Sequence, residues 1–282
     1  MNKAFPLLKQ FCTFIAMRHL VQMKKRGGLP KPWTDDEILQ TYRFCNIYRE
    51  LDTVTQWIAG NWRFPHRNDP DLWFAMAVAR LVNWPDSLAA VGYPAPWNAK
   101  RFVKHMDARK AAGEKVFTGA YMIHAGPNPG SKAGYLAEEV LTPMWEKRKA
   151  LRPTAQDTLA SFHERLMTCK DMGSFMAGQV VADVKYAGLL ADAEDWHTWA
   201  APGPGSKRGL NRVCGNERDE KWRDDHWLQV LQELREEVNK ALPDQWERLH
   251  AQDVQNCLCE FDKYERVRLG EGRPRSLYNG RV

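Results

Sequence analysis

Hydrophobic residues recur along most of the chain at the three- and four-residue spacing of amphipathic helices. After Thr34, for example, a capping-box pattern with Glu37 is followed by apolar residues at helical spacing as far as Tyr48. Strand-like alternation is nearly absent, and its best candidate, 116–123, is short. The pattern predicts an all-α protein, with helices over residues 34–48, 69–82, 100–112, 133–150, 154–169, 175–190, 220–241 and 251–267.

Three stretches rich in glycine and proline interrupt the helical pattern, namely 119–134, 200–215 and the tail from Gly270. None is polar enough to force a domain boundary, and no repeat of fixed period is visible. We therefore expect residues 1–282 to form a single domain with two helical lobes.

The charge balance indicates a polyanionic partner. Lys and Arg exceed Asp and Glu to give a net charge of +6, and several of the 12 tryptophans stand among basic residues. A merely basic soluble protein is the alternative interpretation. No apolar run approaches the length that spans a membrane, so we expect a cytoplasmic protein.

The six cysteines do not have the spacing of a metal site. No pair forms a C-x-x-C motif, and Cys257 and Cys259 are too close together for a usual zinc knuckle. We therefore expect free thiols, no resident metal and no cofactor.

Residues 159–190 are similar to the helix-hairpin-helix of DNA glycosylases. One helix reaches a tight turn at Gly173, and a second follows from Ser174 with small residues in its first turns. Backbone N–H groups at the start of the second helix can hold a phosphate, which makes Gly173 and Ser174 candidate DNA contacts. Asp171 stands where that family has its first hairpin glycine, and an ordinary αα-corner remains the alternative.

The stretch 202–212 concentrates groups that bind anions. Its glycines expose backbone amides beside hydroxyl and cationic side chains, although the spacing is not that of a Walker A loop. We predict a loop that binds phosphate or pyrophosphate, with a solvated turn as the alternative. The candidate residues are Gly205, Ser206, Lys207, Arg208 and Arg212.

Two predicted helix faces combine acidic and basic side chains. On the first, Asn46, Arg49 and Asp52 follow one another at three-residue spacing. On the second, Glu260 and Lys263 are i,i+3 neighbours. A surface salt bridge or a solvated helix face is the alternative in both cases.

The combination of these features resembles a known family. The run from Asn46 to Asp52, the segment 118–121, the hairpin, the stretch 205–209 and the run 259–264 are together similar to phage alpha-glutamyl/putrescinyl thymine pyrophosphorylases, also called amino acid:DNA transferases. The chain also looks like the related helical domain of 5-hydroxymethyluracil DNA kinase. The resemblance extends from about Thr34 to Tyr278, and no P-loop is present, so we expect no kinase activity from this chain alone.

The resemblance implies a DNA base hypermodification enzyme. In that family the phosphate or pyrophosphate on an activated 5-hydroxymethyluracil is replaced by an amine or amino acid, and the pyrophosphate that leaves could carry a divalent metal. The implied partners are double-stranded phage DNA, a free amino acid or polyamine and a 5-hydroxymethyluracil DNA kinase, with no membrane. We therefore expect the glycosylase-like core to flip the base out of the duplex. We also expect the protein to act in the cytoplasm of an infected host cell.

The resemblance also suggests roles for the candidate residues. The 202–212 stretch would stabilise the leaving group, and Asp52, Glu260 or Asp195 would accept the proton of the amine. In this sequence, the position of the glycosylase carboxylate falls near Ser206 and Lys207. Asp195 is a candidate because it is the acidic residue nearest to that position. The remaining candidates are Lys263 beside the acids, Arg43, Asn46, Arg49 and Tyr121 for the substrate, and Arg273 and Arg275 for DNA.

Two other functions stay open on the sequence alone. A hairpin-type DNA glycosylase would excise a modified base, although the apparent loss of the acid near Ser206 argues against excision. A non-catalytic DNA-binding partner of the kinase would bind DNA with a strong dependence on salt and leave its bases unchanged.

Overall fold

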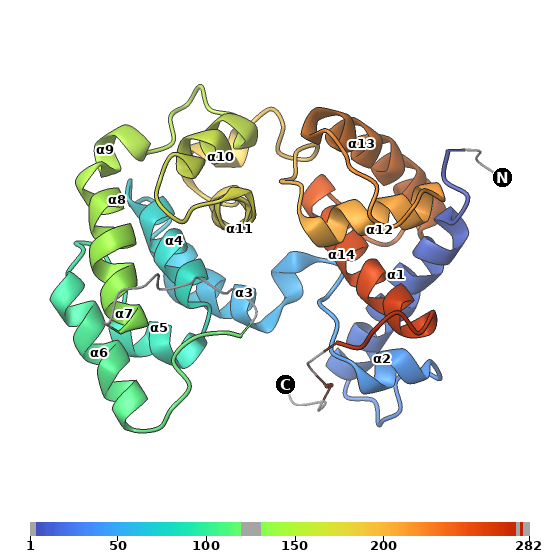
Figure 1. Cartoon of the computed structure of the whole chain (residues 1–282), viewed down its shortest axis with the longest axis horizontal. Helices are drawn as coiled ribbons and strands as arrows, with labels where there is room; N and C mark the ends of the chain where they lie inside the picture. The colour runs from blue at the N-terminus through green and yellow to red at the C-terminus, as the bar shows by residue number, and fades with distance from the viewer. Residues whose placement is uncertain (1–3, 120–130, 275–276, 279–282) are drawn as a thin grey trace. The chain divides into compact units, whose positions relative to one another are not determined.

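The computed structural model describes residues 4–119, 131–274 and 277–278, and its regular elements are helices (Figure 1). Those residues contain no strand, and an isolated antiparallel bridge joins Tyr42 and Leu277. The prediction of an all-α fold is confirmed. The strand candidate at 116–123 forms no strand over 116–119, and its remaining residues lie outside the described part of the chain.

The chain divides into two compact units. Unit 1 comprises Met1–Asp52 and His197–Val282, and unit 2 comprises Thr53–Trp196. The expectation that residues 1–282 make a single domain stays a prediction.

Unit 1 is a helical cluster organised around its last helix. Its core joins buried side chains of several helices, including Phe11, Phe14, Trp227 and Phe261, and the rings of Phe14 and Phe261 lie 5.7 Å apart. Aromatic residues of this size bury large apolar areas and so dominate the stability of a core. The elements are α1 (Leu8–Arg26), α2 (Glu37–Thr41), the 3₁₀ turn η1 (Arg49–Leu51), α12 (Pro204–Cys214), α13 (Asp224–Ala241) and α14 (Ala251–Arg268).

The close packing of α12 on α14 depends on a glycine (Figure 1). A Cβ atom added to Gly209 would lie 2.1 Å from the carbonyl oxygen of Leu258 on α14, a distance that no real side chain tolerates. Gly205, one turn earlier, faces the Cys259 side chain, with 3.2 Å between its added Cβ and the sulfur. The glycines of this stretch therefore let two helix backbones meet.

Replacing Gly209 with alanine should destabilise the fold by about 2–3 kcal/mol, because α12 must move away from α14 to admit the methyl group. Chemical denaturation followed by circular dichroism measures the loss. Gly60→Ala is the matched control, since a Cβ there meets nothing within 4 Å and should be neutral or slightly stabilising. Equal stability of the two variants would contradict the proposed close approach.

Unit 2 is built on a buried central helix. Every residue of α4 (Leu72–Val82) is buried, and α11 (Ser174–Val184) packs against it. A helix that is apolar on all sides needs neighbours on all sides. The other elements of unit 2 are α3 (Thr53–Ile58), the π-helical turn η2 (Ala59–Arg63), α5 (Pro85–Val91), α6 (Ala99–Ala111), α7 (Lys132–Tyr135), the π-helical turn η3 (Leu136–Leu141), α8 (Thr142–Glu146), α9 (Arg148–Leu151), α10 (Leu159–Met167) and the 3₁₀ turn η4 (Gly188–Asp192).

The core of unit 2 contains buried charged side chains that pair with one another. Arg80 on α4 donates two hydrogen bonds to the carboxylate of Asp183 on α11, at 2.5 and 2.6 Å. The Arg80 guanidinium also donates to Asn83 and to the Thr55 hydroxyl, at 3.1 and 3.0 Å. Buried charges need such full pairing, so this pair fixes how α11 sits on α4.

Two helices in contact lie where the hairpin is predicted, and their identity as a helix-hairpin-helix stays a prediction. α10 and α11 pack together and are joined by residues 168–173, and Gly173 is the N-terminal cap of α11. Asp171 has a φ of 58°, the left-handed region that favours glycine. The sequence resemblance places the first hairpin glycine at this residue, and the likeness to glycosylase hairpins stays a prediction.

The structure shortens or divides several of the predicted helices, and it changes two predicted elements more substantially. The helix expected over 34–48 is capped by Asp36, whose carboxylate accepts the Leu39 N–H at 2.8 Å, and it ends at Thr41. The loop expected over 202–212 is mostly helix, because Pro204 suits a first helical position and the Ser206 hydroxyl accepts the Gly203 N–H at 3.0 Å. The many glycines of this stretch predicted a loop, but they instead allow α12 to pack closely against α14.

Candidate functional site

The strongest candidate site lies in unit 1, where the segment 44–52 meets one face of α14. Asn256 donates from its amide to the Asn46 carbonyl at 3.1 Å, and the Cys45 N–H donates to Glu260 Oε2 at 2.9 Å. Lys263 donates to the same Glu260 oxygen and lies 4.6 Å from the centre of the Phe44 ring. The i,i+3 relation predicted for Glu260 and Lys263 is therefore a real ion pair that also holds the segment.

Asp52 is the carboxylate best placed for chemistry. Its Oδ1 accepts both the backbone N–H and the side-chain amide of Asn46, at 2.9 and 3.1 Å. Its Oδ2 accepts no hydrogen bond from a residue that the structure describes. One oxygen is thus fixed while the other can receive a proton.

The surroundings of Asp52 make it a better base than an ordinary aspartate. Burial raises the pKa of its carboxyl, and the nearby Glu260 carboxylate raises it further. The hydrogen bond from Asn46 and the charges of Arg18 and Arg49 oppose this rise without cancelling it. A carboxylate with a raised pKa accepts protons more readily near neutral pH.

The structure brings Asn46 and Asp52 together, but not as one face of a helix. Residues 42–48 are not helical, and Arg49 begins the short turn η1. The Arg49 side chain is mostly buried, and its backbone N–H donates to Asp253 Oδ1 at 3.1 Å, whereas Arg43 is exposed. The predicted helix face is wrong, because hydrogen bonds to α14 side chains replace those of a helix.

Arg18 is a residue of this site that the sequence did not reveal. Its guanidinium donates to the Asn46 side-chain oxygen at 2.8 Å and to the Phe44 carbonyl at 3.1 Å. It thus orients the amide that holds Asp52. Nothing in the local pattern of α1 links Arg18 to residues 28 positions later, so only the fold could identify it.

Most of the predicted anion-binding groups already have partners. The Ser206 hydroxyl caps α12, Lys207 pairs with the exposed Asp224, and Arg212 is held between Asp262 and Glu271. Arg208 differs, since its Nε donates to Asp262 at 2.9 Å while its terminal nitrogens make no hydrogen bond to a described residue. Arg208 is therefore the member of the group with donors available for a phosphate.

Asp195 has a structural partner in unit 2. Its two carboxylate oxygens accept the N–H groups of Leu159 and Ala160 at 2.7 and 3.0 Å, which caps the start of α10. Capping accounts for this carboxylate, so we leave it out of the proposed catalytic group.

The other predicted contacts are dispersed. Gly173 is exposed at the start of α11 and Ser174 is partly buried there, and their role in DNA binding stays a prediction. Arg273 is exposed and lines a cavity of about 450 Å³ beside Thr41 and Tyr42. Tyr121 and Arg275 lie outside the described residues.

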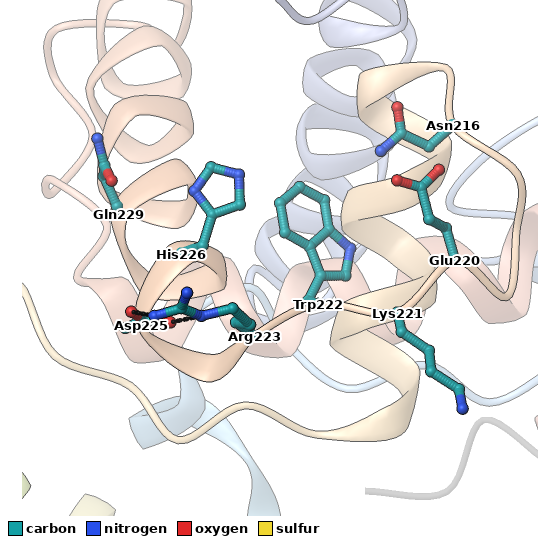
Figure 2. Close-up of a pocket in the computed structure, with 8 residues that line it drawn as sticks. All are labelled: Asn216, Glu220, Lys221, Trp222, Arg223, Asp225, His226 and Gln229. Atoms are coloured by element: carbon teal, nitrogen blue, oxygen red, sulfur yellow. Dashed lines mark hydrogen bonds and ion pairs between the residues drawn. The ribbon is translucent and has the colours of Figure 1, made fainter.

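A larger cavity of about 610 Å³ lies between the connection after α12 and the start of α13 (Figure 2). Trp222 and His226 stand side by side in it, with ring centres 5.3 Å apart, and Trp222 donates to the Asn211 side chain. None of the predicted site residues lines it. The lining residues are Asn216, Glu220, Lys221, Trp222, Arg223, Asp225, His226 and Gln229.

Two general properties of the described residues bear on function. They contain no cluster of three or more His, Cys, Asp or Glu side chains arranged to hold a metal ion. Within the same residues, no helix combines the length and the apolar character needed to cross a membrane.

Comparison with known proteins identifies the family. The family model described as "5-hmdU DNA kinase, helical domain" matches residues 5–273. A curated protein of Bacillus phage SP10, named 5-hmdU DNA kinase, is 28% identical over 228 residues, which cover 72% of this chain and 35% of that kinase. The chain therefore spans about a third of the relative's length, and no solved structure matched it. The resemblance inferred from the sequence is confirmed for the kinase's helical domain, and the chain belongs to the 5-hmdU DNA kinase helical-domain family.

Proposed function

We propose that this chain replaces the pyrophosphate of an activated 5-hydroxymethyluracil in phage DNA with an amine or amino acid. The observation that carries the proposal is Asp52, with one oxygen fixed by Asn46, the other available and a raised pKa. Membership of a family named for a 5-hmdU DNA kinase supports DNA carrying this base as the substrate.

In the proposed reaction, an amine nitrogen attacks the exocyclic methylene carbon of a flipped base. The new C–N bond forms as the C–O bond to pyrophosphate breaks, and the bonding electron pair leaves with the pyrophosphate. Asp52 takes the proton that the amine must lose. Arg208, anchored by Asp262, is suited to stabilise the leaving group.

Nucleoside mass spectrometry tests the proposal. DNA containing pyrophosphorylated 5-hydroxymethyluracil is incubated with the protein and a mixture of amino acids and polyamines, with and without a divalent metal. A new amine adduct on the base, together with released pyrophosphate, is the expected result. Abasic sites would instead identify a glycosylase, and unchanged bases would identify a DNA-binding protein.

Glu260→Gln should shift the acid limb of the transfer rate to lower pH. The Glu260 charge raises the pKa of Asp52, so its removal lowers that pKa and keeps Asp52 ionised in more acidic solution. The pH profile of single-turnover transfer measures the shift. A limb that stays in place would show that Asp52 is not the titrating base.

A second candidate function is that of a DNA-binding domain that serves the kinase reaction. It is favoured by the family match itself, which is to the helical domain of a kinase and not to a whole transferase. In that case, adding the chain to a 5-hmdU DNA kinase would stimulate phosphorylation of DNA, while the chain alone would leave every base unchanged.

A further inference from the structure

A second surface of unit 1 combines cations with aromatic rings. Lys31 lies 5.3 Å and Lys25 6.0 Å from the centre of the Trp33 ring, and Lys24 donates to the Trp33 carbonyl at 3.0 Å. The Tyr278 ring lies 6.2 Å from that of Trp33 and 5.8 Å from Lys25. We call this surface the Trp33 patch, and it comprises Arg18, Lys24, Lys25, Lys31, Trp33, Arg43 and Tyr278.

The patch is assembled from distant parts of the chain. Arg18, Lys24 and Lys25 belong to α1, while Lys31 and Trp33 lie in the connection to α2. The C-terminal segment adds Tyr278, whose N–H donates to the Thr41 carbonyl at 2.9 Å. The fold thus gathers these groups onto one surface, since their sequence spacing does not.

Most cations of the patch are not neutralised by an ion pair within the described part of the chain. Arg18, Lys24, Lys31 and Arg43 form no ion pair with a residue that the structure describes, whereas Lys207, Arg208 and Arg212 on α12 each pair with a carboxylate. Neighbouring like charges repel one another, which costs stability unless a polyanion binds. The pKa of Lys25 is lowered by burial and by the charges of Arg18, Arg43 and Lys31, in keeping with the proximity of these cations.

We infer that the Trp33 patch binds the phosphate backbone of DNA and directs it to the candidate site. Clustered Lys and Arg side chains neutralise phosphates, and aromatic rings among them are suited to nucleic acids. Arg18 connects the two regions, because its positive charge acts on Lys25 of the patch while its guanidinium donates to Asn46, which holds Asp52. The inference rests on the proposed function in that DNA is taken as the substrate.

Charge reversal at two exposed positions tests the inference. Lys31→Glu/Arg43→Glu should weaken binding of a fluorescent duplex about tenfold or more, measured by anisotropy. The slope of log affinity against log salt should also fall by about 0.9 for each phosphate that the variant no longer neutralises. Lys100→Glu/Lys104→Glu, on the exposed side of α6, is the control because it makes the same change in net charge.

A milder variant, Lys31→Gln/Arg43→Gln, should give an intermediate loss of DNA affinity and guards against misfolding as the cause. Equal loss in the patch and control variants, or no loss in either, would overturn the inference. So would a patch variant that binds DNA normally but fails to bind phosphatidylserine vesicles that the wild type binds, since the patch would then serve a membrane.

The same proteins separate this inference from the proposed function. If the wild type binds DNA through the patch but forms no amine adduct, the transfer proposal fails while the inference about the Trp33 patch is supported. If the wild type forms the adduct while the patch variant binds DNA normally, the surface inference fails and the transfer proposal stands.

Discussion

An Asp52→Asn variant is expected to transfer amine at least about 100-fold more slowly than the wild type, because a general base typically contributes about 10²–10⁴-fold. Asparagine has the same shape, and its oxygen can still accept the two hydrogen bonds from Asn46. It cannot take the proton of the amine. Single-turnover transfer, read by nucleoside mass spectrometry, measures the loss.

The pH dependence of the transfer rate shows in which direction ionisation of Asp52 affects transfer. Asp52 acts as a base only when ionised, and its pKa lies above the ordinary value of 3.8. Transfer by the wild type should therefore fall as the pH drops through that raised pKa, and the limb should vanish in Asp52→Asn. Asp107→Asn, at an exposed position of α6, should keep both the rate and the limb.

Binding measurements complete the design of the Asp52 experiment. Asp52→Asn should bind duplex DNA as tightly as the wild type, because the substitution leaves the Trp33 patch intact. A variant that keeps full transfer activity would exclude Asp52 as the base. A variant that loses transfer only in proportion to its loss of DNA affinity would assign Asp52 to binding.

The second large effect is expected in the core of unit 2. Asp183→Asn should destabilise the protein by about 3–5 kcal/mol, because it leaves the Arg80 charge buried without its carboxylate partner. Arg63, also buried, lies 3.8 Å from the same carboxylate, so the variant removes a negative charge beside a second cation as well. Denaturant unfolding, followed by circular dichroism, measures the change.

Glu139→Gln is the matched control for Asp183→Asn, because it breaks an ion pair of the same unit at the surface. Glu139 and Lys170 are about half exposed, and pairs of that kind contribute about 1 kcal/mol at most. If the two variants lose similar stability, burial of the Arg80–Asp183 pair is not what makes it important.

Several features followed from local sequence patterns alone. The helical period predicted the all-α fold, because the spacing of apolar residues reflects one buried face per helix. The turn at Gly173 placed the start of α11 correctly, since a small residue and a following apolar run mark a helix boundary. Glu260 and Lys263 pair as predicted, because i,i+3 neighbours on a helix meet whatever surrounds them.

The arrangement of the candidate site required the tertiary structure. The segment 42–48 has helical spacing, yet its backbone is held by Glu260 and Asn256 of α14, more than 200 residues later. Intrinsic helix preferences amount to less than about 1 kcal/mol per residue, so a few long-range hydrogen bonds and buried contacts override them. Arg18 joins the site in the same way.

The sequence by itself determined the helical class, the likeness to the kinase helical domain and the identity of Asp52, Glu260 and Arg208 as candidates. Only the fold decided that Asp52 is held by Asn46, that Asp195 caps a helix and that most of 202–212 belongs to the helix α12. The physical reason is that helix formation depends on neighbours in sequence. The availability of a carboxylate or guanidinium depends instead on partners that only folding brings near.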